Sequence, residues 1–326
     1  NDIAESYRIN TSTDNLDAFF SGKQIVLKTK STSGAYINGF PLTNNAASRT
    51  TNGAYMVIKP GTHTLRIRYW VKDVATQIEG TITKIIPSHT FAKNEYVNME
   101  ADLQIKNYDG DHYYMWDAQE QYWKGYEWTK NLPAGVGQPT RNGLGSSNYA
   151  QSSSDANHRW YHEGSGAFQA NLSCAGLPNA NEMSWYAMYG DPRWDGDELW
   201  TTMGHLYKGG IWFKKKSVLM AEGNYNTEKS ADNTTDLRTT WKFYGVSKNF
   251  DIPSATTADN YFYLPALGFY DEFGKPDRIG SVGYYWSSSA EVDHSINAVC
   301  LYFGPTHVYV EAGGRNFGMR VKPLFE

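Results

Sequence analysis

The sequence contains few cysteines. Cys174 and Cys300 are the only two among its 326 residues. No CxxC pair is present, which excludes the usual zinc-ribbon and thioredoxin-like motifs. Two alternatives remain open for these cysteines. They form one disulfide that closes a long loop, as an oxidising compartment permits, or they are two separate buried thiols.

Long hydrophobic runs and dense positive charge are also missing. No stretch approaches the ~20 apolar residues that span a membrane as a helix. The chain begins at Asn1 rather than at a methionine. We therefore expect that a signal peptide or lipid-anchor segment was removed, and that any membrane attachment is through a lipidated N-terminus. The net charge is −4 and the one dense basic run is 214–216, which argues against a nucleic-acid partner.

Motifs for catalysis and for metal binding are absent from the sequence. It has no G-x-S-x-G, H-E-x-x-H or P-loop, and no pair of carboxylates can be identified as in a glycosidase. Asp195, Asp197 and Glu198 form an acidic group, but a calcium site needs about six or more oxygen ligands. Helix capping explains this group more simply. We therefore expect neither an enzyme nor a cofactor or metal site.

Aromatic residues are what the sequence has in quantity, with 24 Tyr, 11 Trp and 14 Phe. Tyr and Trp combine a flat apolar face with a polar edge, which suits the binding of sugars, peptides or protein surfaces. The alternative is that a β-rich protein uses these residues in its core. We expect this core role for Trp286.

The N-terminal part of the chain has a strand pattern. Short apolar or alternating runs lie at 24–28, 54–58, 62–71, 81–86 and 96–103. No helical stretch interrupts them, which predicts an antiparallel β-sandwich. From Lys106 the composition changes to an irregular connector over 106–172. We place the domain boundary there, with one domain at 1–105 and a second at 106–326.

Two helices and a terminal sheet are predicted in the second domain. Asn179 can cap a helix over 181–189 that ends at Gly190. Asp195 or Asp197 can cap another helix that continues to Tyr207, with one apolar face. A polar, irregular stretch follows at 218–259. Strand patterns return at 283–288, 298–303, 307–311 and 317–322, and the middle two predict a hairpin.

Five segments of this second domain resemble, in order, the sequence blocks of the major paralogous domain family (FISUMP). Residues 174–186 are similar to its LPT-x-x-E-W block, residues 283–289 to G-x-YWSSS and residues 297–303 to NA-x-x-LYF. Residues 262–268 and 315–323 resemble two further blocks. The resemblance implies a C-type-lectin-like α+β fold. The calcium-binding motifs of sugar-binding lectins are absent, so we do not expect calcium-mediated sugar binding.

The N-terminal part resembles fimbrillin-type surface proteins of anaerobic Gram-negative gut bacteria. The resembling segments are 87–97, 115–118 and 122–125. This resemblance implies an exported lipoprotein at the cell surface or outer membrane, sometimes a pilus-tip or accessory subunit. The predicted fold class is therefore α+β overall, with an N-terminal antiparallel β-sandwich plus a C-terminal C-type-lectin-like α+β domain.

The outer side of the terminal sheet is the candidate binding surface. Because side chains alternate along a strand, Val308 and Val310 can face the core and leave the polar residues of the same strand outward. The candidate ligand-binding residues are Glu291, Asp293, His294, His307, Tyr309, Glu311, Arg315 and Asn316. The alternative is an ordinary solvated sheet face.

Composition, motifs and resemblance together favour a binding function. We expect a cell-surface adhesin or binding protein that recognises an extracellular glycan or protein through this surface. The alternative is a structural or accessory pilus subunit that joins other subunits by β-strand addition.

Overall fold

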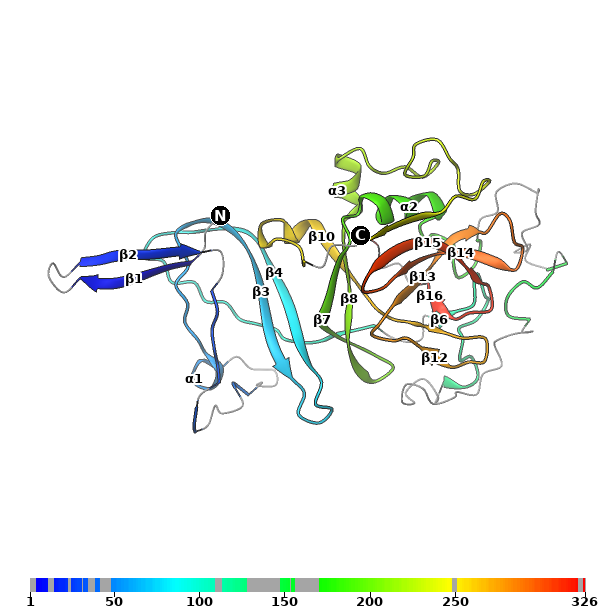
Figure 1. Cartoon of the computed structure of the whole chain (residues 1–326). Coiled ribbons are helices and arrows are strands. Elements are labelled where there is room, and N and C mark those ends of the chain that lie inside the picture. Colours follow the sequence, from blue (N-terminus) through cyan, green and yellow to red (C-terminus); the bar gives the residue numbers. More distant parts are fainter. Residues whose placement is uncertain are drawn as a thin grey trace. The chain divides into compact units, whose positions relative to one another are not determined.

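The computed structural model describes most of the chain in two compact units. The described residues are 4–10, 15–22, 25–30, 32–34, 39–41, 48–108, 113–127, 147–152, 154–155, 170–247, 251–321 and 325 (Figure 1). Unit 1 comprises Asn1–Ile67 and Lys84–Gln104, and unit 2 comprises Arg68–Thr83 and Ile105–Glu326. The domain limits expected from the sequence, 1–105 and 106–326, stay a prediction.

Unit 1 is built on two antiparallel hairpins. The first pairs β1 (Ala4–Asn10) with β2 (Asn15–Gly22), and the second pairs β3 (Gly61–Lys72) with β4 (Glu79–Phe91), whose distal halves belong to unit 2. A single helical turn, α1 (Arg49–Asn52), begins after Ser48, whose hydroxyl accepts the N–H of Thr51. The strands predicted at 62–71 and 81–86 are thereby confirmed.

Three other predicted strands of this unit are wrong. Residues 25–28 of the strand predicted at 24–28, whose first residue lies outside the described ranges, and residues 54–58 and 96–103 carry apolar side chains but are not strands. Tyr55 and Val57 are 78% and 72% exposed. Strand propensity reflects packing against a neighbouring strand rather than a backbone preference, and among the described residues these segments pair with none. The pattern therefore predicted strands that have no partner.

Unit 2 contains most of the regular structure. Its strands are β5 (Lys106–Asn107), β6 (Tyr113–Tyr114), β7 (Arg193–Thr202), β8 (His205–Lys214), β9 (Tyr244–Ser247), β10 (Tyr261–Pro265), β11 (Phe269–Tyr270), β12 (Pro276–Asp277), β13 (Gly283–Ala290), β14 (Asn297–Phe303), β15 (His307–Gly314) and β16 (Met319–Arg320). Its helices are α2 (Ala180–Tyr189), α3 (Lys216–Ala221) and the 3₁₀ helix η3 (Ala255–Asn260).

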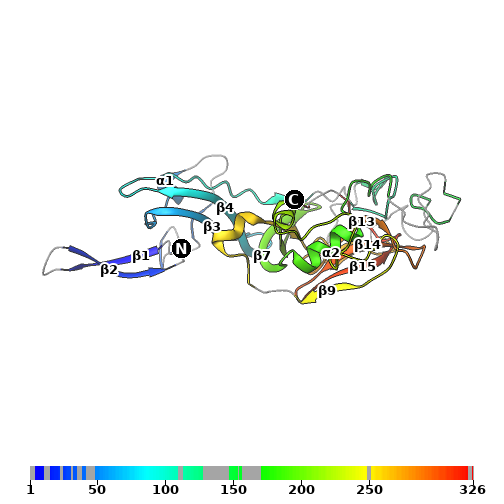
Figure 2. The ribbon, with the colours of Figure 1, turned by 90° about the horizontal axis from the view of Figure 1, so that it is seen from above.

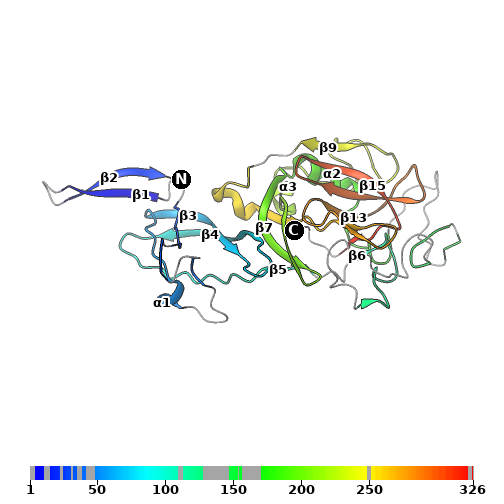
Figure 3. The ribbon, with the colours of Figure 1, turned by 60° about the horizontal axis from the view of Figure 1, so that its bottom comes forward.

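Two larger sheets organise these strands. The terminal sheet has the order β6-β16-β13-β14-β15-β9, with β9 at its edge beside β15 (Figure 3). In the second sheet, β10, β8 and β7 lie side by side, and β7 also pairs in parallel with β5 and, at Thr81, with β4. A short pair, β11–β12, stands apart.

The predicted α+β fold class is wrong. The described residues form sixteen strands, in several mixed sheets, and only four helices, so the protein is closer to all-β. The reason lies in the second predicted helix, from Asp195 or Asp197 to Tyr207, which is instead the hairpin β7–β8. Met203 and Gly204 both have positive φ, of 53° and 75°, as a tight two-residue hairpin turn requires.

This hairpin also corrects the role expected for the acidic group. The carboxylate of Asp195 accepts a hydrogen bond from Arg68 Nη2 at 2.9 Å, and Glu198 accepts one from the backbone N–H of Thr83 at 2.9 Å. Asp197 is half-exposed and lies 3.5 Å from Lys208. Asp195 and Glu198 therefore hold the end of the β3–β4 hairpin against β7, and none of the three carboxylates caps a helix.

The first predicted helix is confirmed as α2. Asn179 Oδ1 accepts the N–H of Glu182 at 3.0 Å, and Glu182 Oε2 accepts the N–H of Asn179 at 2.8 Å. This reciprocal capping box begins the helix, and Gly190 ends it. The terminal strands are confirmed as β13, β14 and β15, whereas the strand expected at 317–322 is reduced to β16.

Two hydrophobic clusters cover opposite faces of the terminal sheet. On the inner face, α2 packs against β13, β14, β15 and β9 (Figure 2), with Tyr186, Leu301 and Val308 in the shared core. On the outer face, part of the sheet is covered by a second cluster that contains Trp116 and Trp286. The core role predicted for Trp286 is confirmed, since its side chain has no exposed area.

Candidate ligand-binding surface

The outer face of the terminal sheet carries a row of aromatic side chains, one end of which packs against the second cluster. Strand register aligns Tyr284 of β13 with Tyr302 of β14, and Tyr302 with Tyr309 of β15. Because side chains alternate, these rings lie opposite the face that packs on α2. The aromatic row consists of Phe317, Phe269, Tyr284, Tyr302, Tyr309 and Phe243.

The rings of the aromatic row contact one another continuously. The centroid distances are 4.7 Å for Tyr284–Tyr302, 5.9 Å for Tyr302–Tyr309 and 5.3 Å for Tyr309–Phe243. At the other end, Phe269 lies 4.9 Å from Tyr284. These separations are in the range in which aromatic pairs attract each other. The row is half-buried, except that Phe243 is 58% exposed.

A glycine lets the row close over the edge strand. Gly245 of β9 is in register with Tyr309. A Cβ atom at this position would lie 2.6 Å from Tyr309 Cδ1 and 2.7 Å from Phe243 Cζ. Only a residue without a side chain therefore allows Phe243 and Tyr309 to meet above β9.

His307 extends the row along β15. Its ring stacks on that of Tyr309 with centroids 4.5 Å apart and planes 13° apart, and it also lies 4.9 Å from Tyr302. Burial lowers the pKa of His307 below its usual 6.5, so the imidazole is neutral at neutral pH. His307 therefore adds a third flat, uncharged ring to this part of the face.

Glu311 supplies a carboxylate at the border of the row. It lies two residues after Tyr309, on the same face, and is in register with the buried Cys300. Burial raises the pKa of the Glu311 carboxyl, while the positive charge of Arg278 opposes the rise. Glu311 is half-buried, and its carboxylate makes no hydrogen bond or ion pair with the part of the chain that the structure describes.

The structure brings together three of the eight residues predicted for the site. His307, Tyr309 and Glu311 share the open part of the outer face. The remaining five lie elsewhere: Glu291, Asp293 and His294 in the loop between β13 and β14, and Arg315 and Asn316 after β15. In that loop, Glu291 is buried and its Oε1 lies 3.2 Å from Nδ1 of the exposed His294.

Arg315 has no exposed area. Its guanidinium carbon lies 4.6 Å from the centroid of the Trp116 ring, and its Nε donates a hydrogen bond to the Asn297 carbonyl at 3.0 Å. A side chain held in this way supports the covered part of the sheet rather than facing solvent. Asn316 is half-buried beside Gly314, whose added Cβ would lie 2.7 Å from Asn316 Oδ1.

The disulfide considered for Cys174 and Cys300 is not formed. Both cysteines are free and fully buried in the second cluster. The Sγ atom of Cys174 accepts the backbone N–H of Asp117 at 3.2 Å. Burial raises the pKa of both thiols, so they are packed as small apolar groups, which is the second of the two alternatives.

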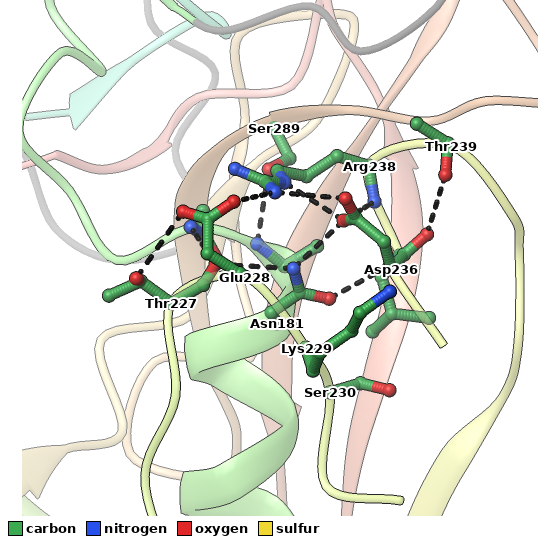
Figure 4. A network of polar contacts seen from close by, with 12 residues as sticks. Asn181, Thr227, Glu228, Lys229, Ser230, Asp236, Arg238, Thr239 and Ser289 are labelled. Carbon is green, nitrogen blue, oxygen red and sulfur yellow. Dashed lines mark hydrogen bonds and ion pairs between the residues drawn. The ribbon is translucent and has the colours of Figure 1, made fainter. Parts of the chain in front are cut away.

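A polar network at the start of α2 fixes the irregular segment that precedes β9 (Figure 4). Asn181 Nδ2 donates to Asp236 Oδ1 at 2.9 Å, and the N–H of Leu237 donates to Asn181 Oδ1 at 2.8 Å. Arg238 binds both carboxylate oxygens of Asp236 and also reaches Glu228. The network is internally paired, so its role is to hold this segment against α2.

The comparisons do not place the chain in a known group. No family model, no curated protein and no solved structure matches it. Within the described ranges, no three His, Cys, Asp or Glu side chains lie close enough together to hold a metal ion. No helix in the same ranges is long and apolar enough to cross a bilayer.

Sequence reasoning missed five of the six residues of the aromatic row, all except Tyr309. Tyr284, Tyr302 and Phe243 join the row only through strand pairing across β13, β14, β15 and β9. The one usable signal was that Tyr284 and Tyr302 each stand in a segment predicted as a strand. Phe269 lies outside any pattern that indicated the terminal sheet.

Proposed function

We propose that the protein is an extracellular binding protein whose aromatic row recognises a glycan. The observation that carries this proposal is the register of Tyr284, Tyr302 and Tyr309 across three adjacent strands, on the outer face of the sheet, where each ring is half-buried and keeps part of its surface exposed. A rigid sheet presents these rings at fixed positions, so little conformational entropy is lost when a ligand binds.

The chemistry of the row fits a carbohydrate. Flat aromatic faces can pack against the apolar C–H faces of sugar rings, while phenol hydroxyls exchange hydrogen bonds with sugar hydroxyls. The half-buried carboxylate of Glu311 can accept hydrogen bonds from further hydroxyls. A shallow surface of this kind gives modest affinity for one ligand, and multivalent display on a cell raises it by avidity.

Export to the cell surface is part of the proposal. It is supported by the similarity of 87–97 to fimbrillin-type surface proteins and of 283–289 and 297–303 to the major paralogous domain family. We propose binding rather than catalysis, because glycoside hydrolysis requires a pair of carboxyl groups and the row is bordered by Glu311 alone among the carboxylates discussed above.

A glycan array followed by calorimetry tests the proposal. We expect the protein to bind at least one glycan class, and the double variant Tyr302→Ala, Tyr309→Ala to weaken that binding by about tenfold or more. Tyr189→Ala is the matched control, because this exposed tyrosine lies on α2, which packs on the inner face. Equal binding by the double variant, or no glycan bound by any form, would contradict the proposal.

Assembly by strand addition is the second candidate function, and one observation favours it. The segments 25–28, 54–58 and 96–103 are apolar, exposed and unpaired among the described residues. An added strand from another subunit could pair with such segments. Sedimentation analysis should then show association that increases with protein concentration. Val57→Lys should reduce this association. Val74→Lys, at a similarly exposed turn of unit 2, should leave it unchanged. A monomer at all concentrations would exclude self-assembly.

A further inference from the structure

Glu311 gives the aromatic row a charge that no ion pair within the described residues neutralises. The carboxylate is half-buried, and partial burial of an unpaired charge costs free energy. Arg278 is the cation whose charge lowers the pKa of the Glu311 carboxyl. Its Nε lies 3.4 Å from Asp277 Oδ2, and it makes no ion pair with Glu311. His307 on the same strand is neutral at neutral pH because burial lowers its pKa.

The surroundings of Glu311 suit a ligand that carries a positive charge. Burial, and then the charge of Glu311, raise the pKa of Tyr302 and of Tyr284, so both hydroxyls stay protonated and can donate hydrogen bonds. Tyr faces attract cations, and a carboxylate forms its strongest hydrogen bonds with charged donors. Glu311 lies two residues from Tyr309, about 7 Å along the strand. A sugar ring on the tyrosines can therefore direct a substituent toward Glu311.

We infer that the aromatic row, together with Glu311, selects glycans that contain an amino sugar with a free, protonated amine. The inference rests on the proposed function and specifies its ligand. The sugar ring packs on Tyr302 and Tyr309, and its ammonium group pairs with the Glu311 carboxylate. The charge complementarity extends to the whole chain, whose formal net charge is −4. An N-acetylated sugar has the same ring but no cation, so it forms the stacking contacts without the ion pair.

Calorimetry with two matched oligosaccharides tests the inference. The probes are glucosamine oligomers and N-acetylglucosamine oligomers of equal length, below the amine pKa. We expect the free-amine oligomer to bind about tenfold more tightly, and Glu311→Gln to lower its affinity to that of the acetylated oligomer. Arg278→Gln removes the opposing cation and should tighten free-amine binding about two- to fivefold. Thermal unfolding of each variant verifies that it is folded.

The outcomes separate the inference from the function on which it rests. Equal or tighter binding of the acetylated oligomer, or no effect of Glu311→Gln, overturns the amino-sugar inference and leaves a glycan-binding row. Equally tight binding of a lysine-rich peptide also overturns it, because the ammonium group would then suffice without a sugar. If neither oligomer binds and the array shows no other glycan, both the inference and the proposed function fail.

Discussion

His307 and Tyr309 lie on the same side of β15, and their rings stack in parallel, 4.5 Å apart. This pair links two features of the protein. It extends the cross-strand row of tyrosines along one strand, and it leads to Glu311 at the next outward position of β15. The arrangement joins flat rings and a single carboxylate on one rigid surface, which depends on close packing of the rings over Gly245.

Replacing Gly245 by alanine should disturb both stability and binding. Its Cβ would lie 2.6 Å from Tyr309 and 2.7 Å from Phe243, so the rings must move. We expect the free energy of unfolding, measured by urea denaturation, to fall by about 1–3 kcal/mol. Gly304→Ala is the control, since its nearest new contact, at 3.5 Å, is an ordinary one. An equal decrease in the free energy of unfolding for Gly245→Ala and Gly304→Ala would contradict the role given to Gly245 in the packing of the row.

The two cysteines should behave as buried thiols. Burial raises the pKa of Cys174 and Cys300, and the thiolate is the reactive form. We expect a thiol reagent to modify neither residue in the native protein and both after unfolding without reductant. Absence of free thiol in the unfolded protein would show a disulfide instead.

Asp236 should stabilise the fold in a pH-dependent way. Burial by itself would raise its pKa, but hydrogen bonds from Arg238 and Asn181 lower the pKa from 3.8 to about 2. Since the folded-state pKa is the lower one, the stabilisation is present above 3.8 and is lost as the pH falls toward about 2. Asp236→Asn should therefore lower the free energy of unfolding by about 1–3 kcal/mol at neutral pH.

Urea denaturation across this pH range checks the Asp236 prediction. The difference between the protein and Asp236→Asn should shrink as the pH decreases below 3.8. Asp197→Asn serves as the control, because the ion pair of Asp197 with Lys208 is exposed and such pairs contribute about 0–1 kcal/mol. A difference that stays constant with pH would show that the ionised carboxylate is not what stabilises the network.

The sequence predicted elements that depend on neighbours in the chain. Asn179, Glu182 and Gly190 begin and end α2 through local hydrogen bonds, and the alternation around Val308 and Val310 placed His307, Tyr309 and Glu311 on one face. The second helix failed because Leu199, Met203 and Leu206 have helical spacing, yet Met203 and Gly204 form a hairpin turn. Periodicity alone could not separate these two structures.

The remaining features depend on contacts between distant segments. Tyr284, Tyr302 and Phe243 form a row only once the strand register is known, and register is not visible in a single strand. The burial of Arg315 under Trp116 was equally hidden, because arginine is almost never fully buried unless it is paired. The same limit applies to the segments of unit 1, whose apolar pattern did not reveal whether a partner strand exists.

The most direct test of the aromatic row observes its rings while a ligand binds. NMR of the protein with isotope-labelled tyrosine rings can be recorded during titration with the glycan that binds most tightly. We predict shifts at Tyr284, Tyr302 and Tyr309. Tyr189 on α2 and Tyr225, whose hydroxyl donates a hydrogen bond to Glu182 of α2, should stay unchanged. If the protein is saturated with glycan and the signals of these three tyrosines do not shift, the aromatic row is not the binding surface.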